Sequence, residues 1–376
     1  MLPNVPLWDD TTWTPLPPLA GTTEATLAVV GLGGSGLAAL RRAHELGIDA
    51  VGIDAGAVAG EAAGRNGGFL LAGMAEFHHD AVDRWGRERA TALYRLTLRE
   101  LERLVAESPE STRVVGSLRI SDSADELDDC ERQLAQMRAD GLDAEWYEGP
   151  EGEGLHLPTD AVSHPMQRCR ALATALLRDG VRLYEHTAAT AIERGCVRTT
   201  EGEVRATHVL VCVDGALPRL FPELSDRVRP IRLQMLGTAP TRDVWVPRPV
   251  YLRYGYDYWQ QLEDGRLVIG GGRDKFEAES ETADAIPTDA VQHYLDAVLR
   301  ARVGADVEIT HRWAATVAYT KDYLPIAEEV RPGVWATGAY SGTGNVVGSM
   351  LARALVEQLT GRSARVLDLL TRDPVA

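Results

Sequence analysis

A glycine-rich turn between a predicted strand and a predicted helix is the feature that most constrains the fold. The β-branched, apolar run from Thr26 to Gly31 predicts a buried strand. Glycines follow at once, and apolar residues then recur at helical spacing as far as Gly47, a typical helix stop. The run from Ile48 to Asp54 predicts a second buried strand. This order is that of a βαβ unit of about 30 residues.

The turn carries a dinucleotide-binding pattern, because residues 30–36 read Val-Gly-Leu-Gly-Gly-Ser-Gly. Gly31 permits the tight turn, Gly33 lets a pyrophosphate approach the backbone, and Gly36 lets helix and strand pack closely. The helix N-terminus offers N–H groups and partial positive charge to the phosphates. Asp54 can accept hydrogen bonds from a ribose and would repel the 2′-phosphate of NADP. The pattern alone does not distinguish FAD from NAD, and a structural turn followed by a chance Asp is the competing interpretation.

Helical and strand patterns alternate along the rest of the chain. Helices are predicted over 84–107, 124–140, 167–179, 288–301 and 346–359. Strands are predicted over 181–186, 190–194, 203–206, 209–213 and 334–337. The stretch 229–272 indicates sheet, and its Asp264-Gly265 turn predicts a hairpin. A capping box from Ser123 to Glu126 opens the second helix.

These patterns predict an α/β fold, α+β overall, with two domains. A Rossmann-like nucleotide-binding domain would be assembled from discontinuous segments around a parallel sheet. An antiparallel-sheet substrate domain flanked by helices would be inserted between them. The predicted segments of the nucleotide-binding domain are 1–80, 150–225 and 310–376, and those of the substrate or cap domain are 81–149 and 226–309.

Charge and cysteine content exclude several classes of protein. The formal net charge of −16 argues against a nucleic-acid partner and against an anionic membrane surface. No apolar window is long enough for a membrane-spanning helix, so no membrane insertion is expected. The four cysteines lack CxxC spacing, which predicts neither a metal site nor a disulfide framework. Reduced cysteines, and an N-terminus whose Asp9 and Asp10 do not suit a signal peptide, indicate a cytoplasmic protein.

Three ordered blocks of sequence resemble one family. The first block is Ala62-Ala63-Gly64-Arg65-Asn66-Gly67-Gly68-Phe69. The others are Arg312-Trp313-Ala314 with Thr320-Lys321-Asp322-Tyr323-Leu324-Pro325, and residues 337–345, Thr-Gly-Ala-Tyr-Ser-Gly-Thr-Gly-Asn. They resemble the D-amino-acid-oxidase-like FAD-dependent oxidoreductases, which include glycine, sarcosine and gamma-glutamylputrescine oxidases. The N-terminal arm, with Trp8 and Trp13, looks most like the gamma-glutamylputrescine oxidase branch.

The resemblance implies that the cofactor is FAD, with Asp54 and the glycine turn on its ADP half. Arg65 to Gly68 would lie along the ribityl chain and the isoalloxazine edge, the backbone of Ala189 would contact adenine, and Gly215 would lie near the pyrophosphate. Gly342 to Asn345 would meet the flavin pyrimidine ring, where a helix N-terminus stabilises negative charge on the reduced flavin; a flexible loop is the competing interpretation. The implied cofactor-binding residues are Gly31, Gly33, Gly34, Ser35, Gly36, Asp54, Ala55, Arg65, Asn66, Gly67, Gly68, Ala189, Gly215, Gly342, Thr343, Gly344 and Asn345.

The same resemblance implies oxidation of the C–N bond of an amine or amino acid by hydride transfer to flavin N5, hydrolysis of the imine, and reduction of O2 to H2O2. Oxidation requires the neutral amine, which an apolar, aromatic environment favours. Tyr254, Tyr256 and Tyr258 alternate and are expected to share one strand face, which either covers the flavin or lies in a core or interface. The cationic candidates for a substrate carboxylate are Arg312, Lys321 and Arg273, and surface or ion-pair roles compete. The predicted catalytic residues are Tyr256, Tyr258, Arg312 and Lys321.

Two departures from the family pattern bear on the chemistry. Residues 314–317 contain no Cys where sarcosine oxidase relatives tether the flavin, so the FAD is expected to be non-covalent. Val268 stands where some relatives place a Lys that promotes oxygen reduction. A dehydrogenase of the same fold with another electron acceptor is therefore the alternative function. A flavin-binding protein without turnover and an NAD-dependent dehydrogenase are the further alternatives.

Overall fold

The computed structural model describes residues 2–10 and 12–370 of the chain, which divides into two compact units. Unit 1 consists of Met1–Asp10, Arg65–Pro165 and Ile231–Thr316, and unit 2 consists of Thr11–Gly64, Met166–Pro230 and Val317–Ala376. Both units are assembled from separated segments. The division differs from the boundaries expected from sequence at 1–10, 65–80, 150–165, 226–230 and 310–316.

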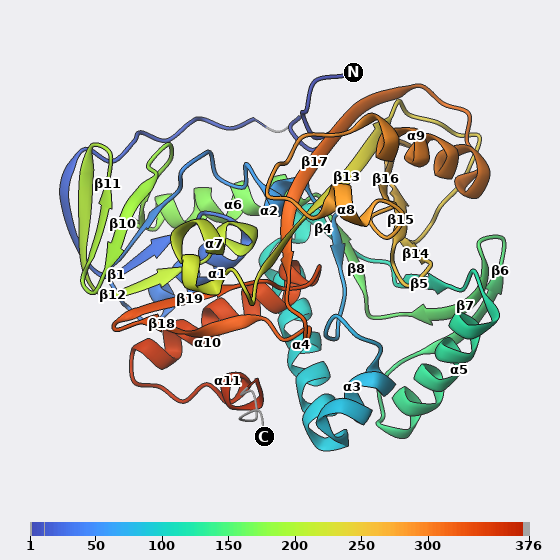
Figure 1. Cartoon of the computed structure of the whole chain (residues 1–376), viewed down its shortest axis with the longest axis horizontal. Coiled ribbons are helices and arrows are strands. Elements are labelled where there is room, and N and C mark those ends of the chain that lie inside the picture. The colour runs from blue at the N-terminus through green and yellow to red at the C-terminus, as the bar shows by residue number, and fades with distance from the viewer. Residues whose placement is uncertain (1, 11, 371–376) are drawn as a thin grey trace. The chain divides into compact units, whose positions relative to one another are not determined.

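Unit 2 contains a parallel sheet whose strands come from distant parts of the chain (Figure 1). Its parallel strands lie in the order β9, β2, β1, β12 and β19, and β18 and the β10–β11 hairpin add antiparallel pairs. The predicted strands 203–206 and 209–213 form most of one strand, β12. The bounds are β1 Gly21–Val30, β2 Ala50–Ile53, β9 Arg182–Tyr184, β10 Ala189–Glu193, β11 Cys196–Thr199, β12 Gly202–Val211, β18 Ile326–Arg331 and β19 Val334–Gly338.

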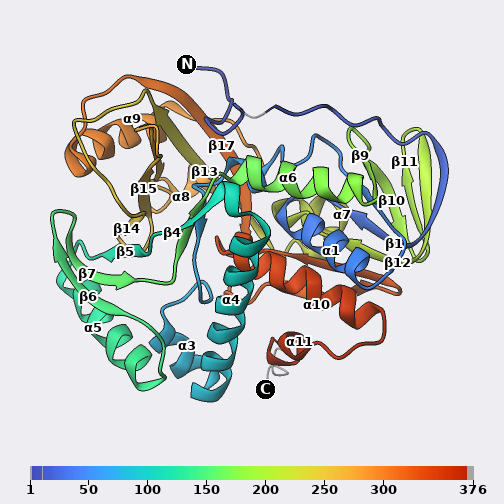
Figure 2. The ribbon, with the colours of Figure 1, turned by 180° about the vertical axis from the view of Figure 1, so that it is seen from behind.

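Three helices cover one face of this sheet. α1 (Gly34–Glu45), α6 (Pro165–Arg178) and α10 (Ser349–Leu359) bury their apolar residues against it and lie side by side in Figure 2. The short helix α7 (Leu217–Leu220) packs on the other face. A π-helical turn, Gly344–Gly348, leads into α10, and α11 (Arg365–Leu369) follows it. The helices that follow the two glycine turns of the sequence therefore belong to one layer.

Unit 1 contains a mixed eight-stranded sheet in the order β17, β13, β16, β15, β14, β5, β7 and β6. The predicted hairpin at Asp264-Gly265 is present, with β15 and β16 antiparallel. Unit 1 also contains a small sheet with the strand order β3, β8, β4. The bounds are β3 Phe69–Leu70, β4 Thr112–Val114, β5 Ser117–Ile120, β6 Glu145–Gly149, β7 Gly152–Leu157, β8 Ala161–Ser163, β13 Arg229–Thr238, β14 Val250–Leu252, β15 Asp257–Gln261, β16 Leu267–Gly271 and β17 Ile309–Tyr319.

The helices of unit 1 come from two of its segments, Arg65–Pro165 and Ile231–Thr316. The predicted helix over 84–107 is two helices, α3 (His78–Trp85) and α4 (Arg87–Glu107), because Gly86 between them has a left-handed φ of +83°. α5 (Ala124–Ala139) begins at the predicted cap, where the Ser123 hydroxyl accepts the Glu126 N–H at 3.2 Å. The remaining helices are α8 Glu277–Ser280 and α9 Asp289–Val298, which continues into a π-helical turn, Leu299–Val303.

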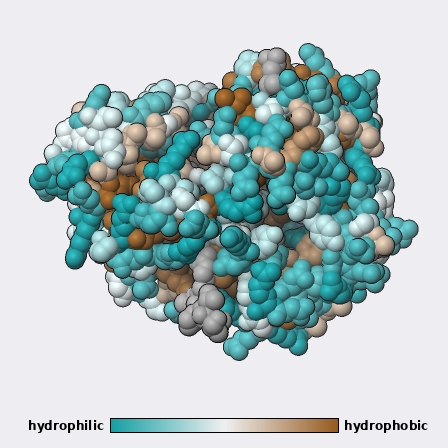
Figure 3. Space-filling model, in the orientation of Figure 1, coloured by the Kyte–Doolittle hydropathy of each residue, from teal (hydrophilic) through white to brown (hydrophobic). Residues whose placement is uncertain are grey.

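Most of one face of the molecule is polar. Figure 3 shows a largely hydrophilic face on which apolar residues appear in small groups. Within residues 2–10 and 12–370, every helix is too short or too polar to cross a lipid bilayer.

Candidate cofactor site

The opening turn of unit 2 has the geometry that its glycines predict. Gly31 has a φ of +104°, and a Cβ there would lie 2.4 Å from the Cys212 carbonyl oxygen. A Cβ on Gly36 would lie 1.8 Å from the Gly31 oxygen, so neither position tolerates a side chain. Gly33 is the N-cap of α1, makes no side-chain cap hydrogen bond, and is followed by no acidic residue in the first helical turn. The N-terminus of α1 therefore offers backbone N–H groups to an anion.

A buried arginine, which sequence analysis missed, lies beside this turn. Arg168 of α6 is 2% exposed, and its Nη2 would lie 3.4 Å from a Cβ on Gly34. The same nitrogen donates to Asn345 Oδ1 at 3.3 Å, whereas the buried Nε has no hydrogen-bond partner among the described residues. A buried, always charged group with a free donor favours an anionic ligand. Arg168 and the N-terminus of α1 thus fit the pyrophosphate of a dinucleotide.

The closing turn meets the opening turn within unit 2. A Cβ on Gly348 would lie 2.6 Å from Ser35 Oγ, and Asn345 accepts from Arg168. The turn contains left-handed residues, including Ser341 at φ +53° and Gly342 at φ +90°. The Thr343 N–H and hydroxyl both donate to the Tyr340 carbonyl, at 3.0 and 2.7 Å. The predicted helix start is present, and it takes the form of the π-helical turn from Gly344 before α10.

Asp214 holds the closing turn in place. Its buried carboxylate accepts the Tyr340 N–H at 3.3 Å and also receives backbone hydrogen bonds from Ala339, Ala318 and Gly215. Burial raises the pKa of Asp214 to about 6, and these four hydrogen bonds oppose that rise. Gly215 lies in the buried turn directly after β12, at the same end of the sheet as Gly31. Its expected contact with the pyrophosphate stays a prediction.

The carboxylate of Asp54 follows β2 and is held by the opening turn. Its Oδ2 accepts the Leu32 N–H at 2.6 Å, and its Oδ1 accepts the Gly56 N–H at 2.8 Å. Burial raises its pKa, against the effect of these hydrogen bonds. Each oxygen retains a lone pair for a ribose hydroxyl. Ala55 is the exposed residue that follows, and Ala189 is the first residue of the β10 edge strand; their contacts with the nucleotide stay predictions.

Sequence analysis also missed Glu185, a third buried carboxylate of unit 2. It is fully buried and accepts the Trp13 indole N–H at 2.9 Å, the Leu16 N–H at 2.6 Å and the Val58 N–H at 2.6 Å. Glu185 therefore ties an extended part of the N-terminal arm to the segment that follows β2.

The block Arg65–Gly68 closes the helical turn α2 (Ala62–Arg65) and belongs to unit 1. The Arg65 guanidinium donates to the Ala314 carbonyl at 2.8 Å and to Asn4. The indole of Trp8 donates to the Asn66 carbonyl at 2.7 Å, and Gln260 donates to the Gly67 carbonyl. A Cβ on Gly68, where φ is +77°, would lie 2.3 Å from the Ser163 oxygen. The block is thus rigidly held, and its expected contact with the flavin stays a prediction.

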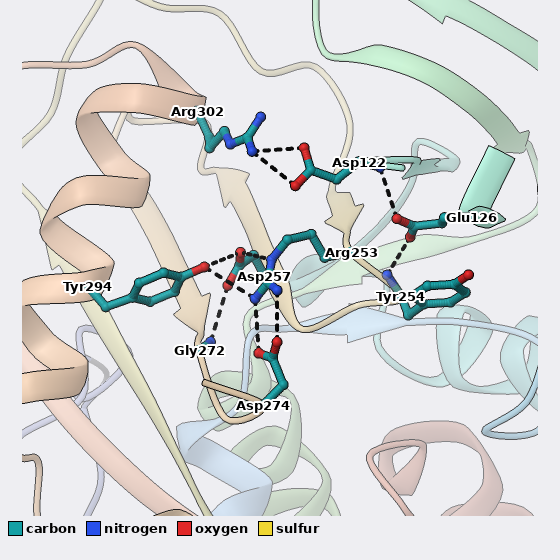
Figure 4. Close-up of polar contacts among 9 residues, drawn as sticks. All are labelled: Asp122, Glu126, Arg253, Tyr254, Asp257, Gly272, Asp274, Tyr294 and Arg302. Atoms are coloured by element: carbon teal, nitrogen blue, oxygen red, sulfur yellow. Dashed lines mark hydrogen bonds and ion pairs between the residues drawn. The ribbon is translucent and has the colours of Figure 1, made fainter. Parts of the chain in front are cut away.

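The expectation that Tyr254, Tyr256 and Tyr258 share a strand face is wrong. Only Tyr258 lies in β15, because the chain turns at Arg253–Gly255, where all three residues have left-handed φ angles of 55°, 55° and 78°. The turn is fixed by Arg253, which pairs with Asp257 and Asp274 at 2.8 Å each, and by the Tyr254 N–H, which donates to Glu126 (Figure 4).

Tyr258 shares its face with other rings instead. It pairs with Tyr251 of β14, and their ring centroids are 5.8 Å apart. Phe69 packs edge-on against both rings, at 5.1 Å from Tyr251 and 5.8 Å from Tyr258. A Cβ on Gly67 would lie 3.2 Å from the Tyr258 ring. Tyr256 lies apart from this cluster, 4.5 Å from the Arg273 guanidinium. Tyr251, Tyr258 and Phe69 form the aromatic face of unit 1.

The cationic candidates Arg312 and Lys321 belong to different units. Arg312 on β17 forms an ion pair with Asp296 at 2.7 Å and donates to Gln292 at 2.9 Å, so its charge is already compensated within unit 1. Lys321 is exposed and follows β17 in unit 2. The ion pair of Arg312 does not support carboxylate binding by this residue. The predicted roles of Arg312 and Lys321 both stay predictions.

A parallel sheet, a glycine turn at a helix N-terminus and a buried arginine with a free donor together define a dinucleotide-binding protein of the Rossmann type. Comparison with known proteins identifies the dinucleotide. The chain belongs to the FAD dependent oxidoreductase family, DAO, whose profile matches residues 26–358. It is therefore an FAD-dependent oxidoreductase, and the predictions of family, fold class and cofactor are confirmed.

Relatives support this assignment over nearly the whole chain. The chain is 28% identical to the probable oxidoreductase OrdL of Rhizobium meliloti, covering 94% of this chain and 87% of the relative. It is 25% identical to the gamma-glutamylputrescine oxidoreductase of Escherichia coli, with 94% and 88% covered. Glycine oxidase from Geobacillus kaustophilus has the same fold, with a TM-score of 0.77 at 18% identity over 94% of this chain and all of that chain.

Proposed function

We propose that this protein oxidises the C–N bond of an amine or amino acid. The substrate loses two electrons and two protons to become an imine, and water then hydrolyses the imine to a carbonyl compound and an amine. The names of similar proteins support this class of donor, since they include gamma-glutamylputrescine oxidoreductase, glycine oxidase and L-proline dehydrogenase. The observation that carries the proposal is the aromatic face of unit 1 beside Gly67, which belongs to the block expected from the family resemblance to lie along the flavin.

The residues of that face suit an amine donor. FAD, when bound, supplies the acceptor for the hydride from the carbon next to nitrogen. The rings of Tyr251, Tyr258 and Phe69 offer a poorly solvated surface, which lowers the pKa of an ammonium and so favours the neutral amine. A side-chain nucleophile is not required for this reaction. Residues 314–317 lie on β17 and contain no Cys, which supports non-covalent FAD.

As an oxidase, the enzyme would pass the electrons from the flavin to O2 and release H2O2. Val268 favours the alternative, a dehydrogenase that passes electrons to another acceptor. It is 1% exposed on β16, directly paired with Gln260, and it provides no cation for the reduction of oxygen. The expected cytoplasmic location rests on the unpaired cysteines and stays a prediction.

Two measurements test the function. The holoenzyme is mixed anaerobically with D- and L-amino acids, N-methyl amino acids, alkylamines and polyamine derivatives, and the loss of yellow flavin absorbance is recorded. Bleaching by at least one amine supports the proposal, and a flavin that stays oxidised with the whole panel contradicts it.

The second measurement identifies the electron acceptor. The reduced enzyme is exposed to air or to a dye. Rapid H2O2 formation supports an oxidase, whereas dye reduction that outpaces it supports a dehydrogenase.

A further inference from the structure

Arg119 extends the aromatic face of unit 1 by one strand. It lies on β5 and is directly paired with Tyr251 of β14, which is in turn paired with Tyr258 of β15. Paired residues project from the same side of a sheet. The next strand, β7, carries Leu155 opposite Arg119, and α5 covers Leu155 with Cys130 and Leu134. Arg119 therefore stands where the aromatic face ends against α5.

The guanidinium of Arg119 lies near the buried carboxylate of Asp160 but does not form an ion pair with it. In the part of the chain that the structure describes, its guanidinium has no ion pair and no hydrogen bond, and it lies 5.2 Å from the Phe77 ring centroid. Arg253 and Arg312, from the same sheet, each pair with at least one carboxylate. Arg119 is half-buried, so it has lost part of its hydration, while its N–H donors have no hydrogen-bond acceptor among the described residues.

The carboxylates around Arg119 are engaged by other groups. Asp160 is fully buried and accepts from the Ser117 hydroxyl at 2.6 Å and the Ala72 N–H at 3.0 Å. Glu126 accepts the N–H groups of Tyr254 and Asp122. A planar, half-buried guanidinium beside aromatic rings is suited to a carboxylate ligand, because it offers two parallel donors and little competing water.

The position of Arg119 also limits the length of the ligand. Gly67 touches the Tyr258 ring, and the Arg119 backbone lies two strands beyond Tyr258, or about 10 Å at ordinary strand spacing. The Arg119 guanidinium points to Phe77, which packs with Tyr254 at the end of β14 rather than with the rings near Gly67. An α-amino acid, whose amine and carboxylate share one carbon, is too short to reach from one end to the other.

We propose that Arg119 binds a carboxylate at the far end of an elongated amine substrate, whose oxidised C–N bond lies near Gly67. Phe77, Tyr251 and Tyr258 line the path of the connecting chain. This inference rests on the proposed amine oxidation and specifies its substrate class. The donor is an ω-amino carboxylate or a longer amine that carries a remote carboxylate.

The kinetic test compares a series of ω-amino carboxylates of increasing length with the matching n-alkylamines. The wild-type holoenzyme should prefer long ω-amino carboxylates. In Arg119→Gln, the ratio of kcat/KM for the carboxylate to that for the alkylamine should fall about 10- to 100-fold, the range for one charge-assisted hydrogen bond, mainly through KM. Arg119→Lys should restore part of the ratio. The matched control, Arg113→Gln, removes an exposed arginine of β4 and should leave the ratio unchanged.

A binding measurement separates this inference from the proposed function. Long straight-chain carboxylates without an amine are titrated into the holoenzyme by calorimetry, which needs no turnover. Binding at least 10-fold weaker in Arg119→Gln than in wild type supports the inference even if no amine is oxidised. Equal binding by the two proteins overturns it. Preferred oxidation of α-amino acids with a ratio unaffected by Arg119→Gln also overturns it, while leaving amine oxidation intact.

Discussion

Replacing Arg168 by Met tests whether the buried guanidinium binds the phosphates of FAD. Methionine fills a similar volume without charge, so it removes the donors that lie next to Gly34 and the N-terminus of α1. A hydrogen bond to a charged group contributes about 1.5–3 kcal/mol, which corresponds to a Kd for FAD about 10- to 150-fold higher. The apo-protein should respond differently. Its Arg168 is buried with an unpaired Nε, so the substitution should leave the apo-protein equally stable or make it more stable.

The assay combines FAD titration of the apo-protein, followed by flavin fluorescence, with thermal unfolding of both forms. At an FAD concentration of about 100 wild-type Kd, binding stabilises the wild type by about 2.7 kcal/mol. A Kd raised about 30-fold reduces that stabilisation by about 2 kcal/mol at the same concentration. Arg178→Met, at an exposed position of the same helix, is the matched control. An unchanged Kd, with apo and holo forms destabilised equally, would show that Arg168 acts only in packing and would refute this reasoning.

Three further predictions address the turns and buried carboxylates. Gly36→Ala places a Cβ 1.8 Å from the Gly31 oxygen and should abolish FAD binding. The control Gly47→Ala, where a Cβ meets no atom within 4 Å, should cost only about 1–2 kcal/mol of backbone strain. FAD titration and urea unfolding measure the two effects, and intact FAD affinity in Gly36→Ala would contradict the turn geometry. Burial raises the pKa of Asp160 and of Asp214 from 3.8 to about 6. Between these pH values the folded state therefore keeps protons that the unfolded state releases. As the pH rises from about 4 to about 6, the free energy of unfolding should fall by about 3 kcal/mol per group. Asp160→Asn should flatten this decline in urea titrations, and an unchanged slope would show that Asp160 does not cause it. Trp8→Phe keeps a buried ring but loses the 2.7 Å hydrogen bond to the Asn66 carbonyl. It should lower the free energy of unfolding by about 1 kcal/mol and increase amide hydrogen exchange over residues 66–68. Unchanged exchange over these residues would mean that Trp8 does not hold the block Arg65–Gly68.

The opening turn could be predicted from sequence because its determinants are local. Gly31 and Gly36 lie within one βα unit, and each is required by atoms of the turn or of the adjoining strand. The closing helix start is local in the same sense, since the carbonyl of its N-cap residue, Thr343, accepts the N–H groups of Val346 and Val347. Short-range patterns therefore identified the two turns, although their meeting through Ser35 and Gly348 required the structure.

The rest of the site depends on contacts between segments distant in sequence. Arg168 resembles any arginine of an amphipathic helix until α6 packs beside α1. Arg119 sits between Leu118 and Ile120 as an ordinary outward-facing strand residue, and only the register with Tyr251 places it on the aromatic face. The sequence contained one indication of the role of Glu185. A carboxylate directly after a predicted strand needs hydrogen-bond donors from other segments if it is buried.

The error over the three alternating tyrosines has a specific cause. A period of two predicts a continuous strand only where every residue can adopt an extended conformation. Gly255 interrupts the run, and the left-handed φ angles of Arg253 and Tyr254 turn the chain before β15 begins. Gly255 was the residue in the sequence that could have indicated this turn.

The interleaving of the two units dictates the order in which this protein can mature on the ribosome. The polypeptide passes between the units five times. β1 acquires its neighbour β12 only after the segment Arg65–Pro165 of unit 1 has been synthesised, and α1 acquires α10 only after all three segments of unit 1. The apolar strand next to the FAD turn is thus unpaired on one edge for most of synthesis, a situation that favours aggregation. The two turns that meet through Ser35 and Gly348 can therefore come together only after both units have largely been synthesised.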